Sequence, residues 1–136
     1  MQNQENNQKI ESLGRLNLEM FKQMSSKFQT DEIVVTHERI QHIKQRHIED
    51  YDLFLQYGAE CVQRPDIILK DEKNAGTVFM IKRISGTNLN VIARLALSND
   101  KEGRKNSVMT FYRVRDKNLK KLMEKHEMLY KCVEIK

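Results

Sequence analysis

The chain has 136 residues, a length typical of a single domain around one hydrophobic core. Its 24 Lys and Arg residues outnumber its 19 Asp and Glu residues, giving a formal net charge of +5. The longest apolar run, Val78 to Ile81, is far shorter than the roughly 18 residues of a membrane-spanning helix. The Asn- and Gln-rich start lacks the apolar segment of a signal peptide, and two cysteines make no disulfide framework. We therefore expect a reduced, cytoplasmic protein with no membrane association.

The positive charge is concentrated in one part of the chain. Residues 82–121 carry 11 basic and 3 acidic side chains, a net of +8, whereas residues 1–81 have a net of −3 and residues 122–136 balance. Concentrated basic charge attracts polyanions by long-range steering and by counterion release from phosphates. A lysine-rich surface that only maintains solubility would give the same count. The charge favours nucleic acid as a partner without establishing it.

The first residues of the chain give weak structural signals. Residues 1–9 are polar and predict a disordered tail ahead of a single domain over residues 10–136. Residues 10–28 fit either a strand or a short helix, and residues 33–35 form only a brief β-branched run.

Two helices are predicted next. Thr36 is a suitable N-cap for a helix that runs to about Ile48. Asp50 can cap a second helix, which Pro65 ends because proline disfavours a continuing helix.

After Pro65 the pattern changes from helical to strand-like. Four short runs rich in β-branched and aromatic residues lie between turn sequences, at residues 66–70, 77–84, 89–97 and 107–114. Short connections pair neighbouring strands antiparallel. Asp116 can cap a final helix, whose His126 we place on the exposed side. The order predicts an α+β fold in which N-terminal helices pack on an antiparallel meander of about four strands, followed by a C-terminal helix.

Three of the four histidines lie close together, at positions 37, 42 and 47. A spacing of five residues turns successive rings by about 140° around a helix, unlike the i, i+4 pairs that share a metal ion. We therefore expect neither a metal nor a cofactor. His42 and His47 could instead serve as acid and base if both face one cleft. Alternatively, His42 is solvated and His47 packs beside Ile43 at the edge of the core.

Two basic residues in the predicted strands need partners. Lys82 shares a face with Val78 and Met80, so its ammonium group either reaches the edge of the sheet or meets an anion. Arg94 interrupts the most apolar strand, and its partner is either a carboxylate or a bound phosphate.

The last predicted strand carries hydroxyl groups. Strict alternation places Thr110 and Tyr112 on one face and Ser107 and Phe111 on the other. The hydroxyls can bond a phosphate or a neighbouring side chain. Tyr112 can stack on a base, although a core or surface tyrosine is the more common case.

Several short motifs occur in a fixed order along the chain. They are Ile33-Val-Val-Thr36, His42-Ile-Lys-Gln-Arg-His47, Pro65-Asp-Ile-Ile, the strand with Lys82, Arg94-Leu-Ala-Leu-Ser98 and Asn106-Ser-Val-Met-Thr110-Phe-Tyr. Over about residues 10–131, this series resembles the phage-associated branch of the barnase–EndoU–colicin–RelE-like (BECR) nucleases. The resemblance implies a small fold with helices on a curved antiparallel sheet, and RNA cleavage without metal. It also implies a toxin carried by a phage or mobile element.

We accordingly expect a metal-independent endoribonuclease that forms a 2′,3′-cyclic phosphate. One histidine, preferably His47, would accept the proton of the 2′-hydroxyl, and the other would protonate the leaving 5′-oxygen. Arg94 and Lys82 would stabilise the charge on the phosphorane, and a hydroxyl would donate a hydrogen bond. The expected site residues are His42, His47, Lys82, Arg94, Ser107 and Thr110.

The expected partners are RNA and a cognate antitoxin or immunity protein. Two rival hypotheses remain open at this point. The chain could be an RNA-binding module without catalysis, or a phage structural or interaction protein with a degenerate nuclease fold.

Overall fold

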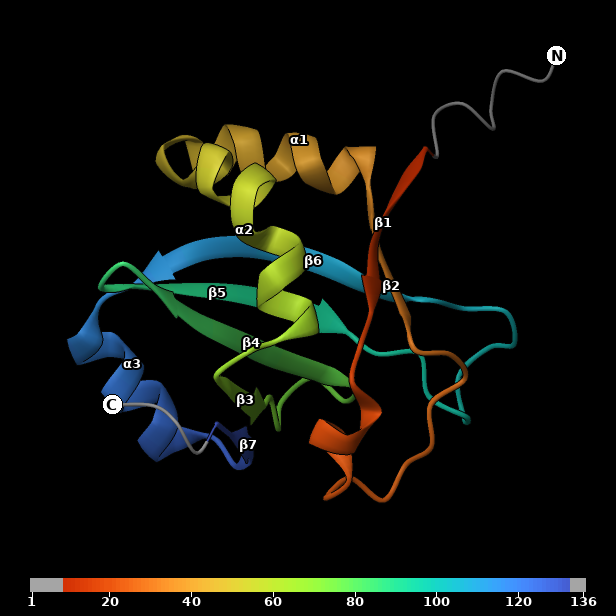
Figure 1. Cartoon of the computed structure of the whole chain (residues 1–136). Helices are drawn as coiled ribbons and strands as arrows, with labels where there is room; N and C mark the ends of the chain where they lie inside the picture. The colour runs from red at the N-terminus through yellow and green to blue at the C-terminus, as the bar shows by residue number, and fades with distance from the viewer. Residues whose placement is uncertain (1–8, 133–136) are drawn as a thin grey trace, which may run out of the picture.

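The computed structural model describes residues 9–132, which form a seven-stranded sheet with three α-helices (Figure 1). The strands are β1 (Ile10–Arg15), β2 (Glu32–Thr36), β3 (Ile67–Lys70), β4 (Thr77–Ile84), β5 (Thr87–Arg94), β6 (Asn106–Val114) and β7 (Met128–Lys131). The helices are α1 (His37–Arg46), α2 (Tyr51–Gln63) and α3 (Asp116–Lys125), with short 3₁₀ turns η2 (Leu18–Phe21) and η3 (Ile48–Asp50). Apart from Lys9, the predicted tail at 1–9 lies outside the described residues. Within the described part, no helix is long and apolar enough to cross a membrane.

The sheet differs from the prediction, which had N-terminal helices followed by a four-stranded antiparallel meander. Its strand order is β1-β2-β6-β5-β4-β3-β7, and all neighbours are antiparallel except β2 and β6. The fold is α+β and strands β3 to β6 do form an antiparallel meander, but the predicted architecture is wrong. Two strands precede the helices, and β2 pairs with a strand about seventy residues later in the chain. Such a parallel pairing depends on tertiary contacts that local patterns do not encode.

The two faces of the sheet are covered unequally. Helix α2 covers one face, where Phe54 packs against Phe111 with ring centroids 5.2 Å apart. Helix α3 covers part of the other face, mainly over β3 and β4. The apolar residues of that second contact are Ile67, Leu69, Phe79 and Ile81 from the sheet, packed against Leu119, Leu122 and Met123 from α3. The part of this second face on β5 and β6 that lies beyond the apolar contacts of α3 is here called the open face.

Local signals placed the helices correctly but explained only one of their caps. The Thr36 hydroxyl accepts a hydrogen bond from the Arg39 amide at 3.1 Å, which confirms the predicted N-cap of α1. Neither Asp50 nor Asp116 caps a helix with its side chain. Both carboxylates instead bond arginines of the sheet, because a charged partner there is available at close range.

A bulge in β6 changes which side chains share a face. The pairing of β6 with β5 skips one residue at Met109, so the strict alternation of the strand is interrupted there. Val108 and Phe111 therefore both face the core under α2. Ser107 consequently lies on the same face as Thr110, and the predicted placement of these two residues on opposite faces is wrong.

The loop between β3 and β4 is attached to the end of α3 through Glu72. Its carboxylate contacts His126 Nδ1 at 2.9 Å and accepts a hydrogen bond from the Glu127 amide at 2.8 Å. The His126 side chain is only 13% exposed and its ring meets Phe79 edge-on, so the expected exposed position is wrong. The Glu127 amide, followed by His126, lowers the pKa of Glu72 to about 2.

This pKa predicts how stability depends on pH. A carboxyl group whose pKa falls from 4.5 to about 2 on folding stabilises the fold above pH 4.5, and loses that effect as the pH falls towards 2. We expect Glu72→Gln to be less stable than wild type above pH 5 and equally stable near pH 2. Urea unfolding across this range measures the difference. Glu124→Gln, at an exposed position of α3, is the control, and a difference that stays constant with pH would contradict the assignment.

Candidate functional site

Polar side chains line the open face where β5 and β6 run together. Asn90 and Tyr112 are direct neighbours across the two strands, and Thr110 lies two residues before Tyr112. Within the described residues, the hydroxyl of Thr110 is buried without a hydrogen-bond partner, whereas the buried carboxamide of Asn90 has Tyr112 as its polar neighbour. Buried polar groups nearly always have a partner, so the Thr110 hydroxyl marks a place suited to a polar ligand. Burial raises the pKa of Tyr112, and the adjacent Asn90 side chain partly offsets that effect.

His47 lies beside Tyr112 at the end of α1. Their ring centroids are 5.5 Å apart, with an angle of 38° between the rings. His47 ends the helix: its amide still bonds the Ile43 carbonyl at 2.8 Å, but its φ of −132° and ψ of 55° are not helical. The backbone therefore turns at His47 and carries its ring towards the sheet.

An ion pair fixes this turn to β6. The carboxylate of Asp50 is buried and accepts hydrogen bonds from the Arg113 side-chain Nε and, at 3.2 Å, from the Arg113 amide. Asp50 follows His47 by three residues, and Arg113 directly follows Tyr112. Because both contacts are made by one carboxylate, they hold η3 against the strand and keep the two rings together.

Helix α1 runs beside β6 beyond the short β2 pairing, which involves only Ile33 and Val34 of β2 (Figure 1). An Arg39 guanidinium nitrogen approaches the Met109 carbonyl oxygen at 3.5 Å. His42 follows Arg39 by three residues, so it lies on a neighbouring part of the helix surface. His42 is half-buried and makes no side-chain hydrogen bond or ion pair within residues 9–132.

Arg94 and Ser107 lie at the far end of the open face. They are direct neighbours across β5 and β6, and Arg94 donates a hydrogen bond to Asp100 at 2.9 Å. The Leu97 amide and then Arg94 lower the pKa of Asp100. Ser107 pairs with Arg94 and Tyr112 with Asn90, and these two partners are four residues apart on β5, about 13 Å at the usual rise per residue. The two ends of the face are therefore too far apart to contact one phosphate.

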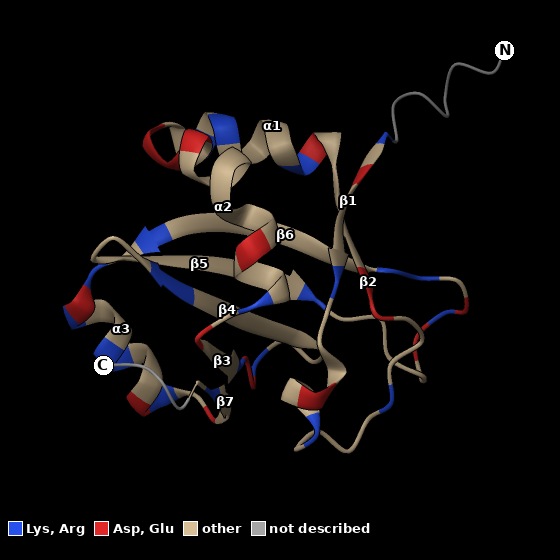
Figure 2. Cartoon of the chain, viewed as in Figure 1, with Lys and Arg blue, Asp and Glu red and all other residues tan. Residues whose placement is uncertain are grey.

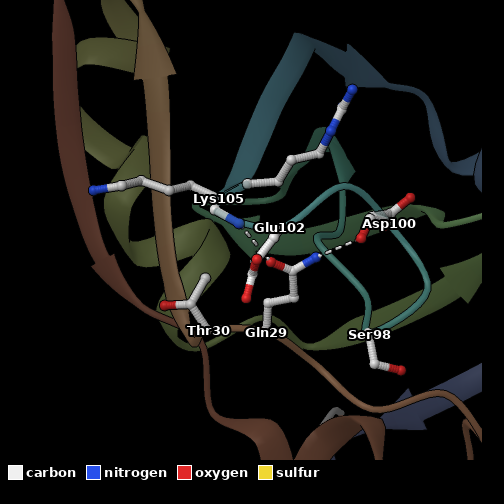
Figure 3. Close-up of a pocket in the computed structure, with 8 residues that line it drawn as sticks. Gln29, Thr30, Ser98, Asp100, Glu102 and Lys105 are labelled. Carbon is white, nitrogen blue, oxygen red and sulfur yellow. Dashed lines mark hydrogen bonds between the residues drawn. The ribbon is translucent and has the colours of Figure 1, made fainter.

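The loop that holds Arg94 is closed by Gln29, next to a concavity of about 670 Å³ (Figure 3). The Gln29 side-chain nitrogen donates to the Asp100 carbonyl at 3.2 Å and the Lys101 carbonyl at 3.0 Å. Its oxygen accepts a hydrogen bond from the Gly103 amide at 3.1 Å. Because these polar groups already bond one another, we assign Gln29 the structural role of closing this loop.

Lys82 is on the opposite face, under α2. Its ammonium nitrogen lies 3.5 Å from Asp66 and 3.9 Å from Glu60, and the side chain is 18% exposed. The anion expected near Lys82 is therefore supplied by the chain itself. The structure brings Thr110 and His47 to the open face with Tyr112, places Arg94 and Ser107 at its far end, and separates Lys82 from all of them.

The basic residues of 82–121 are distributed over β4, β5, β6, the loop between β5 and β6, and α3 (Figure 2). Several of its cations are paired with carboxylates: Lys82, Arg83, Arg94, Lys105 and Arg113. Within the described residues, the unpaired ones are Lys101, Arg104, Arg115, Lys117, Lys120 and Lys121. Four of these last residues belong to α3 or directly precede it. The same described residues hold no group of three His, Cys, Asp or Glu side chains arranged to bind a metal ion.

Sequence reasoning missed two parts of this site. Asn90 belongs to the string Thr87-Asn-Leu-Asn90, where two carboxamides alternate with apolar residues in a strand; this unusual pattern could have indicated a polar face. Asp50 was interpreted as a helix cap because its spacing fits one. Its link to Arg113 spans 63 residues, and no local signal indicates it.

Comparison with known proteins gave one finding. Residues 8–131, nearly the whole chain, match the profile of a family described as phage-Barnase-EndoU-ColicinE5/D-RelE like nuclease2. Neither the comparison with curated proteins nor that with solved structures gave a match.

The Asp50–Arg113 pair gives a direct test of the site geometry. Asp50→Ala leaves the Arg113 side chain without its buried partner, so we expect a loss of about 2 kcal/mol in the free energy of unfolding. We also expect the NMR resonances of the His47 ring to lose the shift caused by the nearby Tyr112 ring. Asp52→Ala removes an exposed carboxylate from the same helix start and should cost about 0.5 kcal/mol. Equal losses of stability in the two variants, with unchanged His47 resonances, would show that the Asp50–Arg113 pair does not hold His47 beside Tyr112.

Proposed function

The chain belongs to the phage-Barnase-EndoU-ColicinE5/D-RelE like nuclease2 family, and from that premise we propose that it is an endoribonuclease acting on the open face. The observation that carries the proposal is the position of His47 beside Tyr112. The unpaired Thr110 hydroxyl lies on the same face of the sheet. An imidazole and a free hydrogen-bond donor near an aromatic surface are suited to a phosphodiester with its attached base.

The proposed reaction uses the RNA 2′-hydroxyl as nucleophile. His47 accepts its proton as the oxygen attacks the adjacent phosphorus, and the bond from phosphorus to the 5′-oxygen breaks. His42, on the same helix, gives a proton to that leaving oxygen. The products are a 2′,3′-cyclic phosphate and a free 5′-hydroxyl. DNA is spared because it lacks the nucleophile, and no metal ion takes part in the proposed steps.

The remaining expected residues take different parts in this proposal. The Thr110 hydroxyl donates a hydrogen bond to a non-bridging oxygen of the reacting phosphate, and Arg39 approaches from α1 to balance its charge. Ser107 lies about 13 Å along the strands from Tyr112, so it is assigned to a neighbouring part of the RNA, whereas Arg94 holds Asp100 and supports that end of the face. Lys82 supports the fold through Asp66 and Glu60 rather than touching RNA.

The same proposal includes the biological setting. We propose a toxin-like enzyme of a phage or mobile element that acts on cytoplasmic RNA. A cognate antitoxin or immunity protein would carry acidic side chains to cover the unpaired cations near α3.

Cleavage assays with histidine variants test the mechanism. In excess chelator, we expect the wild type to cleave RNA, and His47→Ala and His42→Ala each to lose about 10²–10⁴ in rate. His37→Ala is the matched control, because His37 is also on α1 but contacts Glu11 away from the open face. It should keep wild-type activity. Thermal unfolding of each variant separates loss of catalysis from loss of folding.

Three results would contradict the mechanism. They are activity that disappears with chelator, activity that survives both substitutions, and products without a 2′,3′-cyclic phosphate. RNA binding without cleavage between pH 5 and 8 would support the rival hypothesis of a non-catalytic module.

A further inference from the structure

A groove of about 320 Å³ lies between the end of β6 and helix α3. Its lining residues are Tyr112, Arg113, Val114, Asn118, Lys121, Leu122 and Lys125. Tyr112 is therefore shared between the groove and the contact with His47. Any chain that passes His47 on the open face and continues over Tyr112 enters this groove.

One side of the groove is a stripe of polar residues on α3. Asn118, Lys121 and Lys125 follow one another at i, i+3 and i+7, beside the Leu122 that packs on the sheet. Within the described residues, neither lysine has a carboxylate partner, and no acidic side chain lines the groove. Arg113, by contrast, is held by Asp50 and Glu49. The free positive charge of the groove therefore comes from α3.

We infer that this groove binds single-stranded RNA next to the cleavage site, with a base stacked on Tyr112 and flanking phosphates on Lys121 and Lys125. The inference rests on the proposed function in one respect: the position of the groove next to a cleavage site assumes that His47 acts on RNA. Two unpaired lysines without a nearby acid match a phosphodiester backbone. A half-buried tyrosine offers a stacking surface to an unstacked base, which a duplex does not present.

A charge-matched pair of variants tests the two lysines. Lys121→Gln/Lys125→Gln removes two charges from the groove, and Lys117→Gln/Lys120→Gln removes two from exposed positions of the same helix outside it. The probe is a fluorescent 2′-O-methyl RNA decamer, which cannot be cleaved because its 2′-oxygens are blocked. Binding can therefore be measured without substituting the histidines. For the groove variant we expect about tenfold weaker binding at 0.15 M salt, and a log–log salt slope smaller by about 1.4, from ~0.7 for each phosphate contact.

Substitutions of Tyr112 test the stacking contact independently. Tyr112→Phe keeps a ring and should bind the decamer as the wild type does, whereas Tyr112→Ala should bind it more weakly. A duplex of the same sequence should bind these two variants equally. A Tyr112→Phe variant that binds as weakly as Tyr112→Ala would remove stacking from the inference.

The outcomes separate this inference from the proposed function. Equal losses in the two lysine variants would indicate general charge attraction and overturn the groove assignment, even if His47→Ala abolishes cleavage. A selective loss in the groove variant supports the groove, even if no cleavage occurs. If binding is lost selectively but no cleavage occurs, the proposed catalysis is wrong and the assignment of the groove to RNA is supported.

Discussion

The contact between Asp50 and Arg113 determines whether the candidate site exists at all. The helical segment and the sheet reach the site from distant parts of the chain, and this pair joins them one residue from Tyr112 and three from His47. A buried carboxylate is costly unless its charge and hydrogen bonds are satisfied. Because Arg113 satisfies Asp50, the chain can turn sharply at His47 instead of continuing α1. The position of the imidazole is thus a consequence of an ion pair that includes neither ring.

The sheet topology supplies the space in which this contact forms. Strand β2 pairs with only the first residues of β6, and the rest of that edge is left to α1 and η3. A longer β2 would place a strand where the helix now approaches Met109. The bulge at Met109 also brings Ser107 to the face that carries Thr110. The short parallel pairing and the bulge together make one polar face from residues that simple alternation would separate.

The sequence allowed part of this arrangement to be predicted. Thr36 identifies the start of α1 because an N-cap is a local interaction, and the strands after Pro65 follow from their composition and turns. The parallel pairing of Val34 with Ser107 and the contact of Asp50 with Arg113 join segments more than sixty residues apart. No spacing within either segment indicates its partner. The histidine helix was therefore recognisable, whereas the surface that it faces was not.

The distribution of charge follows from the different chemistry of arginine and lysine. Arg83, Arg94 and Arg113 each donate hydrogen bonds to a carboxylate and to at least one further oxygen acceptor. This suits the planar guanidinium group, which has several donors. The lysines of α3 are exposed, and those at Lys121 and Lys125 meet no acid near the groove. A net charge of +8 over residues 82–121 therefore overstates the field available to a ligand, because the arginines are largely used by the fold. The ammonium groups that remain beside Tyr112 are those of Lys121 and Lys125, and these suit a flexible phosphate backbone better than a rigid partner.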